Sequence, residues 1–215
     1  MPDFRLHCFS QSGNAYKAAL MLALSGADWE PIFVDFFNGE TRRPEWREAV
    51  NALGEAPVLE HGDRRLSQSG VILSYLARHL GKFGPESEQE ELEILRWMLF
   101  DNHKFTSYFA TYRFLYSLAP QPGEPAVMAF LKGRADAAFA IVDNHLAAHP
   151  FLLGGRPTIA DISLAGYMFF PEAEHGYDFA ASHPGLHAWK ERIKALPGWV
   201  EPYALMPGEQ FLAPR

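Results

Sequence analysis

The chain has 215 residues, of which 48% are hydrophobic, and a formal net charge of −7 at pH 7. These values fit one large or two small folded domains with a substantial core. The acidic balance argues against a nucleic-acid or acidic-membrane partner, because either needs a concentrated basic face. Cys8 is the single cysteine, which excludes an intrachain disulfide, and no uncharged run approaches the ~20 residues that span a bilayer. With no apolar signal core at the N-terminus, we expect a cytoplasmic protein.

The N-terminal part of the chain alternates strand-like and helical patterns. Phe4–Phe9 reads as a strand, apolar residues recur at helical spacing from Ala15 to Leu22, and Gly26 follows as a stop signal. Ile32–Phe37 is a short continuous apolar run, which predicts a buried strand. Strand, helix and strand in this order imply parallel pairing through a right-handed crossover.

A hairpin and another helix follow. After a short helix over Pro44–Ala52, the strand-like segments Pro57–Glu60 and Arg64–Leu66 flank a His-Gly-Asp turn. Apolar residues from Ile72 to Leu80 then mark a helix that Gly81 closes. This part of the chain is therefore of the α/β class.

Beyond Gly84 the strand-like alternation disappears and long helical periodicities take over. We predict one domain of residues 1–82 and an all-helical domain of residues 86–215. Thr158 and Asp161 form a capping box, with the hydroxyl at N-cap and the carboxylate at N3, before an apolar helix at the centre of the second domain. The expected helices span residues 86–118, 126–148, 159–170, 187–196 and 199–205, and Pro207 onward looks like a tail.

The tetrapeptide Ser-Gln-Ser-Gly occurs at residues 10–13 and again at residues 67–70, each time between a strand-like run and a helical pattern. Both copies therefore open a helix, where unpaired N–H groups, a partial positive charge and hydroxyl donors favour an anion. Two such sites suggest a ligand with two negative ends. Ordinary helix capping by serine is the alternative.

A resemblance to the glutathione-binding half of the cytosolic glutathione transferases lies in two segments, Glu55-Ala56-Pro57-Val58-Leu59 and Leu66-Ser67-Gln68-Ser69-Gly70-Val71-Ile72, with the hairpin between them. Residues 4–81 resemble the thioredoxin-like domain of that family, and the helical remainder resembles its second domain. The resemblance implies an α/β plus all-α fold, with a thioredoxin-like N-terminal domain followed by an all-helical C-terminal domain. It also implies a homodimeric glutathione S-transferase of the serine type, which uses glutathione as co-substrate and binds no cofactor.

By this resemblance Pro57 is a cis proline before a strand, and Ala56 offers its backbone N–H and C=O to the cysteinyl part of glutathione. Only main-chain atoms are needed there, so alanine is acceptable. Glu55 departs from the amide commonly found at its position. Glu55 is counted among the glutathione-binding candidates, although a carboxylate near an anionic tripeptide is expected to weaken binding.

The pair Gln68 and Ser69 matches the family's pair that holds the γ-glutamyl end of glutathione. The Ser69 hydroxyl and the N–H groups of the following helix would receive the α-carboxylate, and the Gln68 carbonyl would accept from the ammonium. Arg42 falls where many members carry a cation for the glycyl carboxylate, with Arg43 as an adjacent substitute. A solvated helix face that also includes Arg47 is the alternative for these arginines.

By its place before the first helix, Ser12 matches the catalytic serine of the serine-type transferases. A cysteine thiol with a pKa near 8.5 is only ~3% ionised at pH 7, and the thiolate is the nucleophile. One hydroxyl donor and a helix N-terminus suffice to lower this pKa by about two units, without a metal or a general base. Ser10 and Asn14 are alternative donors, although Asn14 also suits a plain N-cap.

Cys8 supplies a second hypothesis, because Leu6-His7-Cys8-Phe9 resembles the Leu-His-Tyr-Phe run of tyrosine-type relatives. With its thiol facing the tripeptide, the protein would be a glutathione-dependent thiol oxidoreductase that works through a mixed disulfide. A lone cysteine inside a strand is more typical of a small buried hydrophobe. A third hypothesis is a non-catalytic module that keeps the fold for binding a partner, since fold alone does not fix function.

Aromatic residues recur at helical spacing from Phe105 to Tyr116, a stripe that is typical of a core. In the family this helix lines the pocket for a small hydrophobic electrophile. The resemblance therefore implies that Tyr108, Tyr112 and Arg113 face that pocket.

Histidines recur at i,i+4 spacing in two pairs, His145/His149 and His183/His187. This spacing puts both imidazoles of a pair on one helix face, where they can meet a metal ion. No third ligand accompanies either pair, and roles at helix ends or on the surface are more typical, so we expect no metal site.

Overall fold

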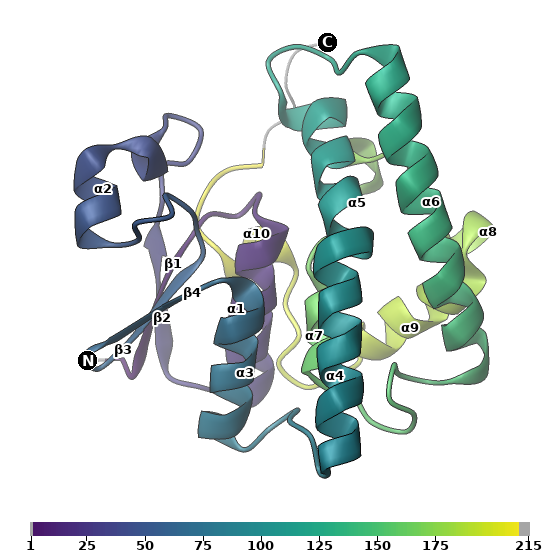
Figure 1. Cartoon of the computed structure of the whole chain (residues 1–215), viewed down its shortest axis with the longest axis horizontal. Helices are drawn as coiled ribbons and strands as arrows, with labels where there is room; N and C mark the ends of the chain where they lie inside the picture. Colours follow the sequence, from purple (N-terminus) through teal and green to yellow (C-terminus); the bar gives the residue numbers. More distant parts are fainter. Residues whose placement is uncertain (1, 211–215) are drawn as a thin grey trace. The chain divides into compact units, whose positions relative to one another are not determined.

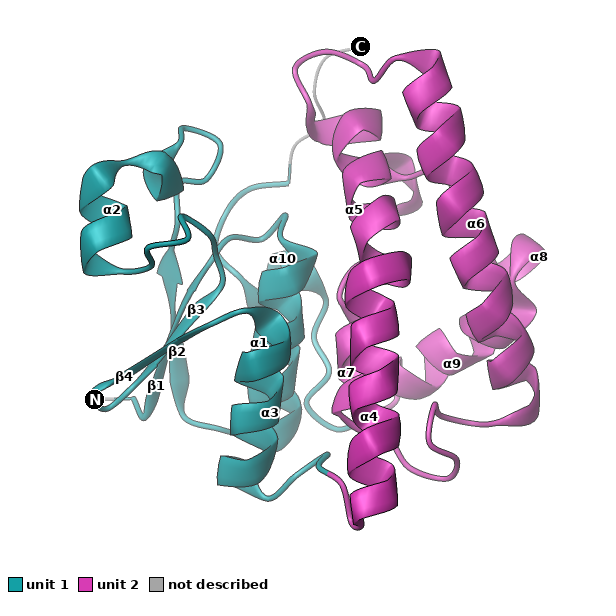
Figure 2. Ribbon diagram, viewed as in Figure 1, with its two compact units in different colours: residues 1–84, 196–210 teal, residues 85–195, 211–215 magenta. Residues whose placement is uncertain are grey.

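The computed structural model describes residues 2–210, which form two compact units (Figure 2). Unit 1 contains the chain up to Gly84 together with Leu196–Gln210, and unit 2 contains Pro85–Ala195. The chain passes from one unit to the next inside the boundary predicted at residues 82–86. The prediction of a helical domain over residues 86–215 is corrected in one respect, because Leu196–Gln210 folds with unit 1.

Unit 1 is built on a four-stranded sheet in the order β2-β1-β3-β4 (Figure 1). β1 and β2 are parallel, and β3 pairs antiparallel with both β1 and β4. The predicted parallel pairing and hairpin are therefore confirmed, and so is the thioredoxin-like class of this domain. The strands are β1 Phe4–Cys8, β2 Trp29–Phe33, β3 Val58–His61 and β4 Arg64–Ser67.

One strand lies earlier in the chain than predicted. Instead of a buried strand over Ile32–Phe37, the sheet has β2 at its edge, and this strand is largely exposed. Beyond it the Val34 N–H donates to the Cys8 carbonyl, and the chain then leaves the sheet. Only part of the apolar run is buried: Val34 packs with Phe9 and Trp46 in a separate cluster, whereas Phe33 and Phe37 are 52% and 41% exposed.

Two helices of unit 1, α1 and α3, pack side by side on one face of the sheet, and α2 lies on the opposite side (Figure 1). Gly26 and Gly81 end α1 and α3 with φ of 63° and 65°, a left-handed conformation that glycine adopts without a Cβ clash. Both stop signals in the sequence are therefore confirmed. The helices of unit 1 are α1 Gly13–Ser25, α2 Pro44–Ala49, α3 Ser69–Leu80 and α10 Pro202–Leu205, with a 3₁₀ turn over Glu40–Arg42.

Unit 2 is helical, as predicted, and no helix within residues 2–210 is long and apolar enough to cross a membrane. One continuous helical path from residue 88 to residue 118 contains α4, α5 and two π-helical turns, which confirms the predicted long helix. α7 ends at Ala165 instead of Phe170, because i→i−3 hydrogen bonds take over from Gly166. The α-helices are α4 Glu88–Phe100, α5 Thr106–Arg113, α6 Pro125–Ala148, α7 Ile159–Ala165, α8 Phe179–Ser182 and α9 Pro184–Lys194.

The capping box predicted for α7 is present, and every residue of this helix is buried. The Thr158 hydroxyl accepts from the Ala160 N–H at 3.3 Å, and the Asp161 carboxylate accepts from the Thr158 N–H at 2.9 Å. Asp161 also accepts from the Leu152 N–H and from Trp189 Nε1–H, both at 3.0 Å. A single buried carboxylate thus joins the loop before α7, the start of α7 and helix α9.

Candidate functional site

Three segments of unit 1 meet at one edge of the sheet. His7 of β1, Val58 of β3 and Ser67 of β4 lie in register across the sheet. β1 and β4 end at or just after these positions, whereas β3 begins there. The turn after β1, the segment before β3 and the start of α3 therefore converge, and these segments carry most of the predicted glutathione-site residues.

Ser12 is the N-cap of α1. Its backbone is extended, with φ −86° and ψ 107°, and its Oγ accepts from the Ala15 N–H at 3.1 Å. A hydroxyl has one donor and two acceptor sites, so this bond leaves the Ser12 proton for another group. Only 7% of Ser12 is exposed, at the positive end of a 13-residue helix. An anion held here would gain a hydrogen bond and the field of the helix together.

Ser10 and Asn14, the two other candidate donors, lie on either side of Ser12 in the chain. The Ser10 hydroxyl is fully buried, and within the described part of the chain neither it nor Asn14 Oδ1 has a hydrogen-bond partner. Buried polar atoms of this kind are uncommon in folded proteins. Polar groups with unused hydrogen-bonding capacity therefore gather around Ser12, and their roles stay predictions.

The C-terminal stretch of unit 1 covers the same turn. The Ser10 N–H donates to the Pro207 carbonyl at 2.8 Å, and Gln11 Nε2 donates to the Glu209 carbonyl. Gly208 has φ 118°, and a Cβ there would stand 2.7 Å from Ser10 Oγ, so glycine is required. The sequence pattern predicted a tail from this point, because no local signal reports a partner 198 residues away in the chain.

The segment before β3 has the backbone that the resemblance implied. The Ala56–Pro57 peptide bond is cis, and Ala56 packs against the cluster that contains Phe9. The preceding Glu55 is exposed, and its carbonyl accepts from Asn51 Nδ2 at 2.8 Å. Asn51 was not among the predicted site residues, and its only signal is the preference of asparagine for turns.

The start of α3 carries Gln68 and Ser69. Gln68 has φ 67° and ψ 116°, a conformation that costs a residue other than glycine about 1–3 kcal/mol and that is concentrated at functional sites. Its Nε2 donates to a Glu55 carboxylate oxygen at 2.8 Å. Ser69 is buried in the first turn, where the N–H groups of α3 have no acceptor within the helix. α3 therefore offers a second helix N-terminus beside a held amide.

Arg42 ends the 3₁₀ turn of unit 1, and both it and Arg43 are exposed. α2 follows directly, and its Trp46 lies in the same buried cluster as Phe9. The arginines are thus carried by a segment that packs beside the turn after β1. The role of Arg42 toward a carboxylate stays a prediction.

Cys8 is enclosed in the sheet. Its side chain is fully buried in β1, and burial raises the pKa of the thiol to about 12. Such a thiol is almost wholly protonated at neutral pH and is a poor nucleophile. This placement favours the small buried hydrophobe over the thiol oxidoreductase.

We expect Cys8 to resist alkylation in the folded protein. At pH 8 only ~10⁻⁴ of a thiol with a pKa of about 12 is ionised, and the side chain is inaccessible as well. Iodoacetamide should therefore modify the native chain at least ~1000-fold more slowly than the urea-unfolded chain, as followed by intact mass. Labelling of the native chain at the unfolded rate would contradict this placement and restore the Cys8 hypothesis.

The three residues predicted to line an electrophile pocket lie in unit 2, in different surroundings. Tyr108 is partly exposed, whereas Tyr112 is 7% exposed and stacks on Tyr116 with 5.6 Å between ring centroids. Arg113 is 1% exposed, and its Nε donates to the Glu174 carboxylate at 3.0 Å. The placement of Arg113 favours a structural ion pair, and Tyr108 is the most accessible of the three.

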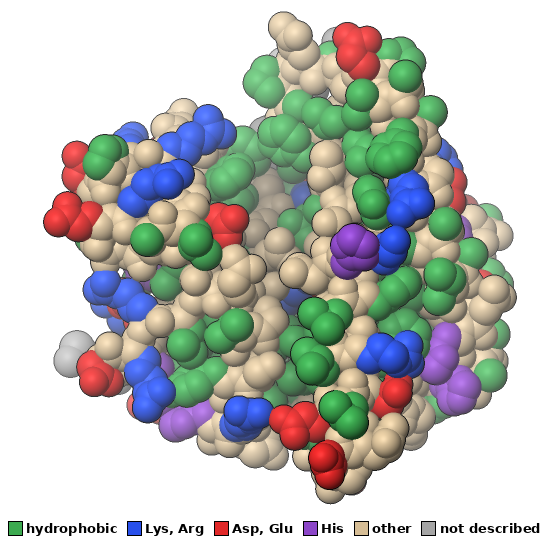
Figure 3. All heavy atoms as spheres, viewed as in Figure 1, with side chains coloured by type: hydrophobic (Ala, Val, Ile, Leu, Met, Phe, Trp, Pro, Cys, Tyr) green, Lys and Arg blue, Asp and Glu red, His purple; other side chains and the backbone are tan. Residues whose placement is uncertain are grey.

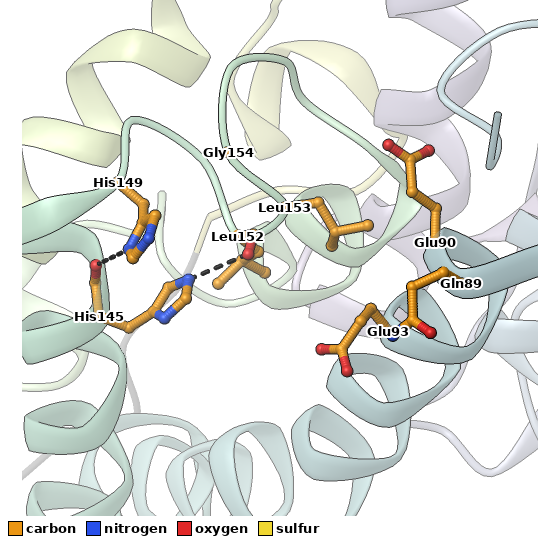
Figure 4. Close-up of a pocket in the computed structure, with 8 residues that line it drawn as sticks. All are labelled: Gln89, Glu90, Glu93, His145, His149, Leu152, Leu153 and Gly154. Atoms are coloured by element: carbon orange, nitrogen blue, oxygen red, sulfur yellow. Dashed lines mark hydrogen bonds between the residues drawn. The ribbon is translucent and has the colours of Figure 1, made fainter. Parts of the chain in front are cut away.

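One histidine pair lines a cavity in unit 2 (Figure 4). His145 and His149 stack with 4.4 Å between ring centroids. His145 Nε2 lies 2.9 Å from the Leu152 carbonyl, and His149 Nδ1 lies 2.9 Å from the His145 carbonyl. These contacts place both rings at the C-terminal end of α6. Among residues 2–210, no group of three or more His, Cys, Asp or Glu side chains is arranged to hold a metal ion.

Comparisons with known proteins point to one family. The sequence model of the glutathione S-transferase N-terminal domain matches residues 4–78, and that of the C-terminal domain matches residues 125–192. Glutathione S-transferase F14 of Arabidopsis thaliana is 27% identical over 207 residues, which cover 92% of this chain and 81% of the relative. A crystal structure of a glutathione S-transferase from Pseudomonas fluorescens is 31% identical with a TM-score of 0.86, covering 94% of this chain and 99% of the other. Elongation factor 1-gamma of Prunus avium is 29% identical over 172 residues, which are 77% of this chain and 39% of the relative.

The chain belongs to the glutathione S-transferase family. It contains both domains of that family in sequence order, and it is an enzyme that transfers glutathione. The fold class implied by the sequence resemblance is therefore confirmed.

Proposed function

We propose that this enzyme uses the Ser12 hydroxyl to ionise the thiol of glutathione, which then attacks a small hydrophobic electrophile. The observation that carries the proposal is the Ser12 side chain at the N-terminus of α1, with its proton left free by the capping bond to Ala15. The site lies at the sheet edge where the cis Ala56–Pro57 segment and the start of α3 also end. It is thus a serine-type site, with Ser10 and Asn14 as further donors.

The energy required is within reach of this arrangement. Lowering a thiol pKa by about two units needs ~2.7 kcal/mol of preference for the thiolate. A hydrogen bond to a charged group contributes about 1.5–3 kcal/mol, and a helix N-terminus adds about 0.3–1 kcal/mol. A much larger shift would reduce the intrinsic nucleophilicity of the sulfur, so this modest device suits catalysis.

The rest of the tripeptide is assigned to the neighbouring segments. We place the γ-glutamyl end at Gln68 and Ser69, the cysteinyl backbone on the main chain of Ala56 beside Pro57, and the glycyl carboxylate at Arg42. The N-terminus of α3 and the exposed Arg42 match the two carboxylates of glutathione, and the N-terminus of α1 matches its thiolate.

A titration of bound glutathione tests the proposal. The thiolate absorbs near 240 nm, so its appearance with pH can be followed in the complex and in free glutathione. We expect the bound thiol to ionise about two pKa units below the free one. Identical titration curves at saturating protein, or the absence of binding, would contradict it.

A second candidate function is a binding role for the same fold beside catalysis. The similarity to elongation factor 1-gamma supports it, because that relative carries the matching region in a much longer chain. Turnover tests the catalytic part, since a module that only binds would retain glutathione yet would not conjugate it to an electrophile such as 1-chloro-2,4-dinitrobenzene.

The electrophile and the partner subunit remain proposals as well. We propose that Tyr108 and Tyr112 line the electrophile pocket and that Arg113, through its pair with Glu174, supports them from beneath the surface.

We also propose a cytoplasmic homodimer. Hydrophobic side chains reach the surface over α4 (Figure 3), and exposed leucines recur there at helical spacing, which suits a partner helix. They are Leu92, Leu95 and Leu99, which are 57%, 51% and 61% exposed.

A further inference from the structure

We infer that Glu55 determines specificity at the γ-glutamyl subsite by fixing the direction of the Gln68 amide, so that the subsite accepts only a free ammonium group. This inference rests on the proposed function. It gives a role to Glu55, whose negative charge was expected from the sequence to weaken glutathione binding. Its basis is the 2.8 Å hydrogen bond from Gln68 Nε2 to the Glu55 carboxylate.

The chemistry of the pair allows one orientation of the amide. An ionised carboxylate offers acceptors only, so the group of Gln68 that faces Glu55 must be the NH₂. The side-chain carbonyl oxygen of Gln68 then points away from Glu55, and it can only accept a hydrogen bond from a ligand. A ligand group at that oxygen must be a donor, and the nearby negative charge of Glu55 favours a cationic donor.

Both partners are held in place by their own segments. The carbonyl of Glu55 accepts from Asn51 Nδ2 at 2.8 Å, and Asn51 Oδ1 in turn accepts from the Leu53 N–H at 3.1 Å. On the other side, the main-chain carbonyl of Gln68 accepts from the Ile72 N–H at 3.0 Å, and the main chain of Gln68 has φ 67°. The side-chain bond therefore joins two fixed backbones, and it sets the amide before a ligand arrives.

The adjacent N-terminus of α3 completes a site for an α-amino acid group. Its first N–H groups and the Ser69 hydroxyl favour a carboxylate, whereas the Gln68 carbonyl and Glu55 favour an ammonium. Gln68 and Ser69 are neighbouring residues at the start of α3, and Glu55 reaches Gln68 from the segment before β3. The chemical class recognised is therefore a zwitterionic end, and an acylated nitrogen loses both its charge and two of its protons.

Binding calorimetry with two ligands tests this inference. S-methylglutathione has a free α-ammonium and cannot react, and its derivative acetylated on the γ-glutamyl nitrogen differs only at that group. We expect the protein to bind the free amine at least tenfold more tightly than the acetylated form. In Glu55→Ala this ratio should fall at least fivefold, and Glu55→Gln, which keeps an acceptor without the charge, should lie between the two.

Glu48→Ala is the matched control, because it removes an exposed glutamate of α2 from the same unit and should keep the ratio of the parent protein. A ratio that stays unchanged in Glu55→Ala, with S-methylglutathione still bound, would overturn the inference and leave the proposed function intact. Failure of the parent protein to bind either ligand would overturn both.

Discussion

Replacing Ser12 with alanine is expected to lower kcat/KM for glutathione conjugation by about 10–100-fold at pH 7. The loss reflects one charge-assisted hydrogen bond to the thiolate, so the pKa of the bound thiol should rise by about one to two units. Steady-state kinetics with 1-chloro-2,4-dinitrobenzene and the 240 nm titration measure the two effects on the same protein. The activity should recover at high pH, because the thiol then ionises without help.

Conservative and neighbouring variants separate this role from helix capping. Ser12→Thr keeps both the cap and the donor and should retain most of the activity, whereas Ser12→Ala also removes the cap of α1 at a cost of about 1 kcal/mol in stability. A thermal melt records that cost independently. If Ser10→Ala or Asn14→Ala reduced kcat/KM more than Ser12→Ala, the assignment of Ser12 would be wrong and the more sensitive residue would take its place.

Replacing Asp161 with alanine is expected to destabilise the fold by about 3–5 kcal/mol, because several buried donors lose their acceptor at a cost of about 1–3 kcal/mol each. The carboxylate accepts from the backbone of Leu152 and Thr158 and from the indole of Trp189. These three residues are themselves buried, so each donor would lose its acceptor away from solvent. Urea unfolding followed by circular dichroism measures the change.

Asp178→Ala provides a matched cap variant. Asp178 is also an N-cap, with its carboxylate accepting from the Ala181 N–H at 3.0 Å, but this bond is exposed at the start of the short helix α8. Its loss should cost only about 0.5–2 kcal/mol. Equal effects of the two substitutions would mean that the buried network around Asp161 adds nothing beyond ordinary capping.

Local patterns in the sequence predicted most of the fold because the strongest signals here are local. Gly26 and Gly81 mark helix ends, and the pair Thr158 and Asp161 marks a helix start, through conformations and hydrogen bonds within a few residues. The strand over Ile32–Phe37 was misplaced for the same reason. An apolar run favours a buried strand, but here only Val34 is fully buried, in a cluster with Phe9 and Trp46, and Phe33 and Phe37 stay exposed.

In the candidate site, too, local features were predicted from the sequence and contacts made by tertiary structure were not. Ser12, Gln68 and Ser69 were predicted to stand where helices begin, and the structure puts them there, whereas their roles toward glutathione were implied by the resemblance alone. The partner of Gln68 was not predicted, because the bond to Glu55 joins two loops through tertiary structure. A carboxylate that looked unfavourable beside an anionic ligand accepts a hydrogen bond from Gln68, which sequence position alone does not reveal.

The composition of unit 1 from two distant pieces of chain has a consequence for biosynthesis. The stretch Leu196–Gln210 emerges from the ribosome only after all of Pro85–Ala195 has been made. Until then the buried phenol of Tyr16 has no Val200 carbonyl to bond, and the main chain at Ser10 has no Pro207 carbonyl. The nascent N-terminal domain therefore stays incompletely closed while the helical domain is translated, and its contacts with Leu196–Gln210 form only after that domain has been made.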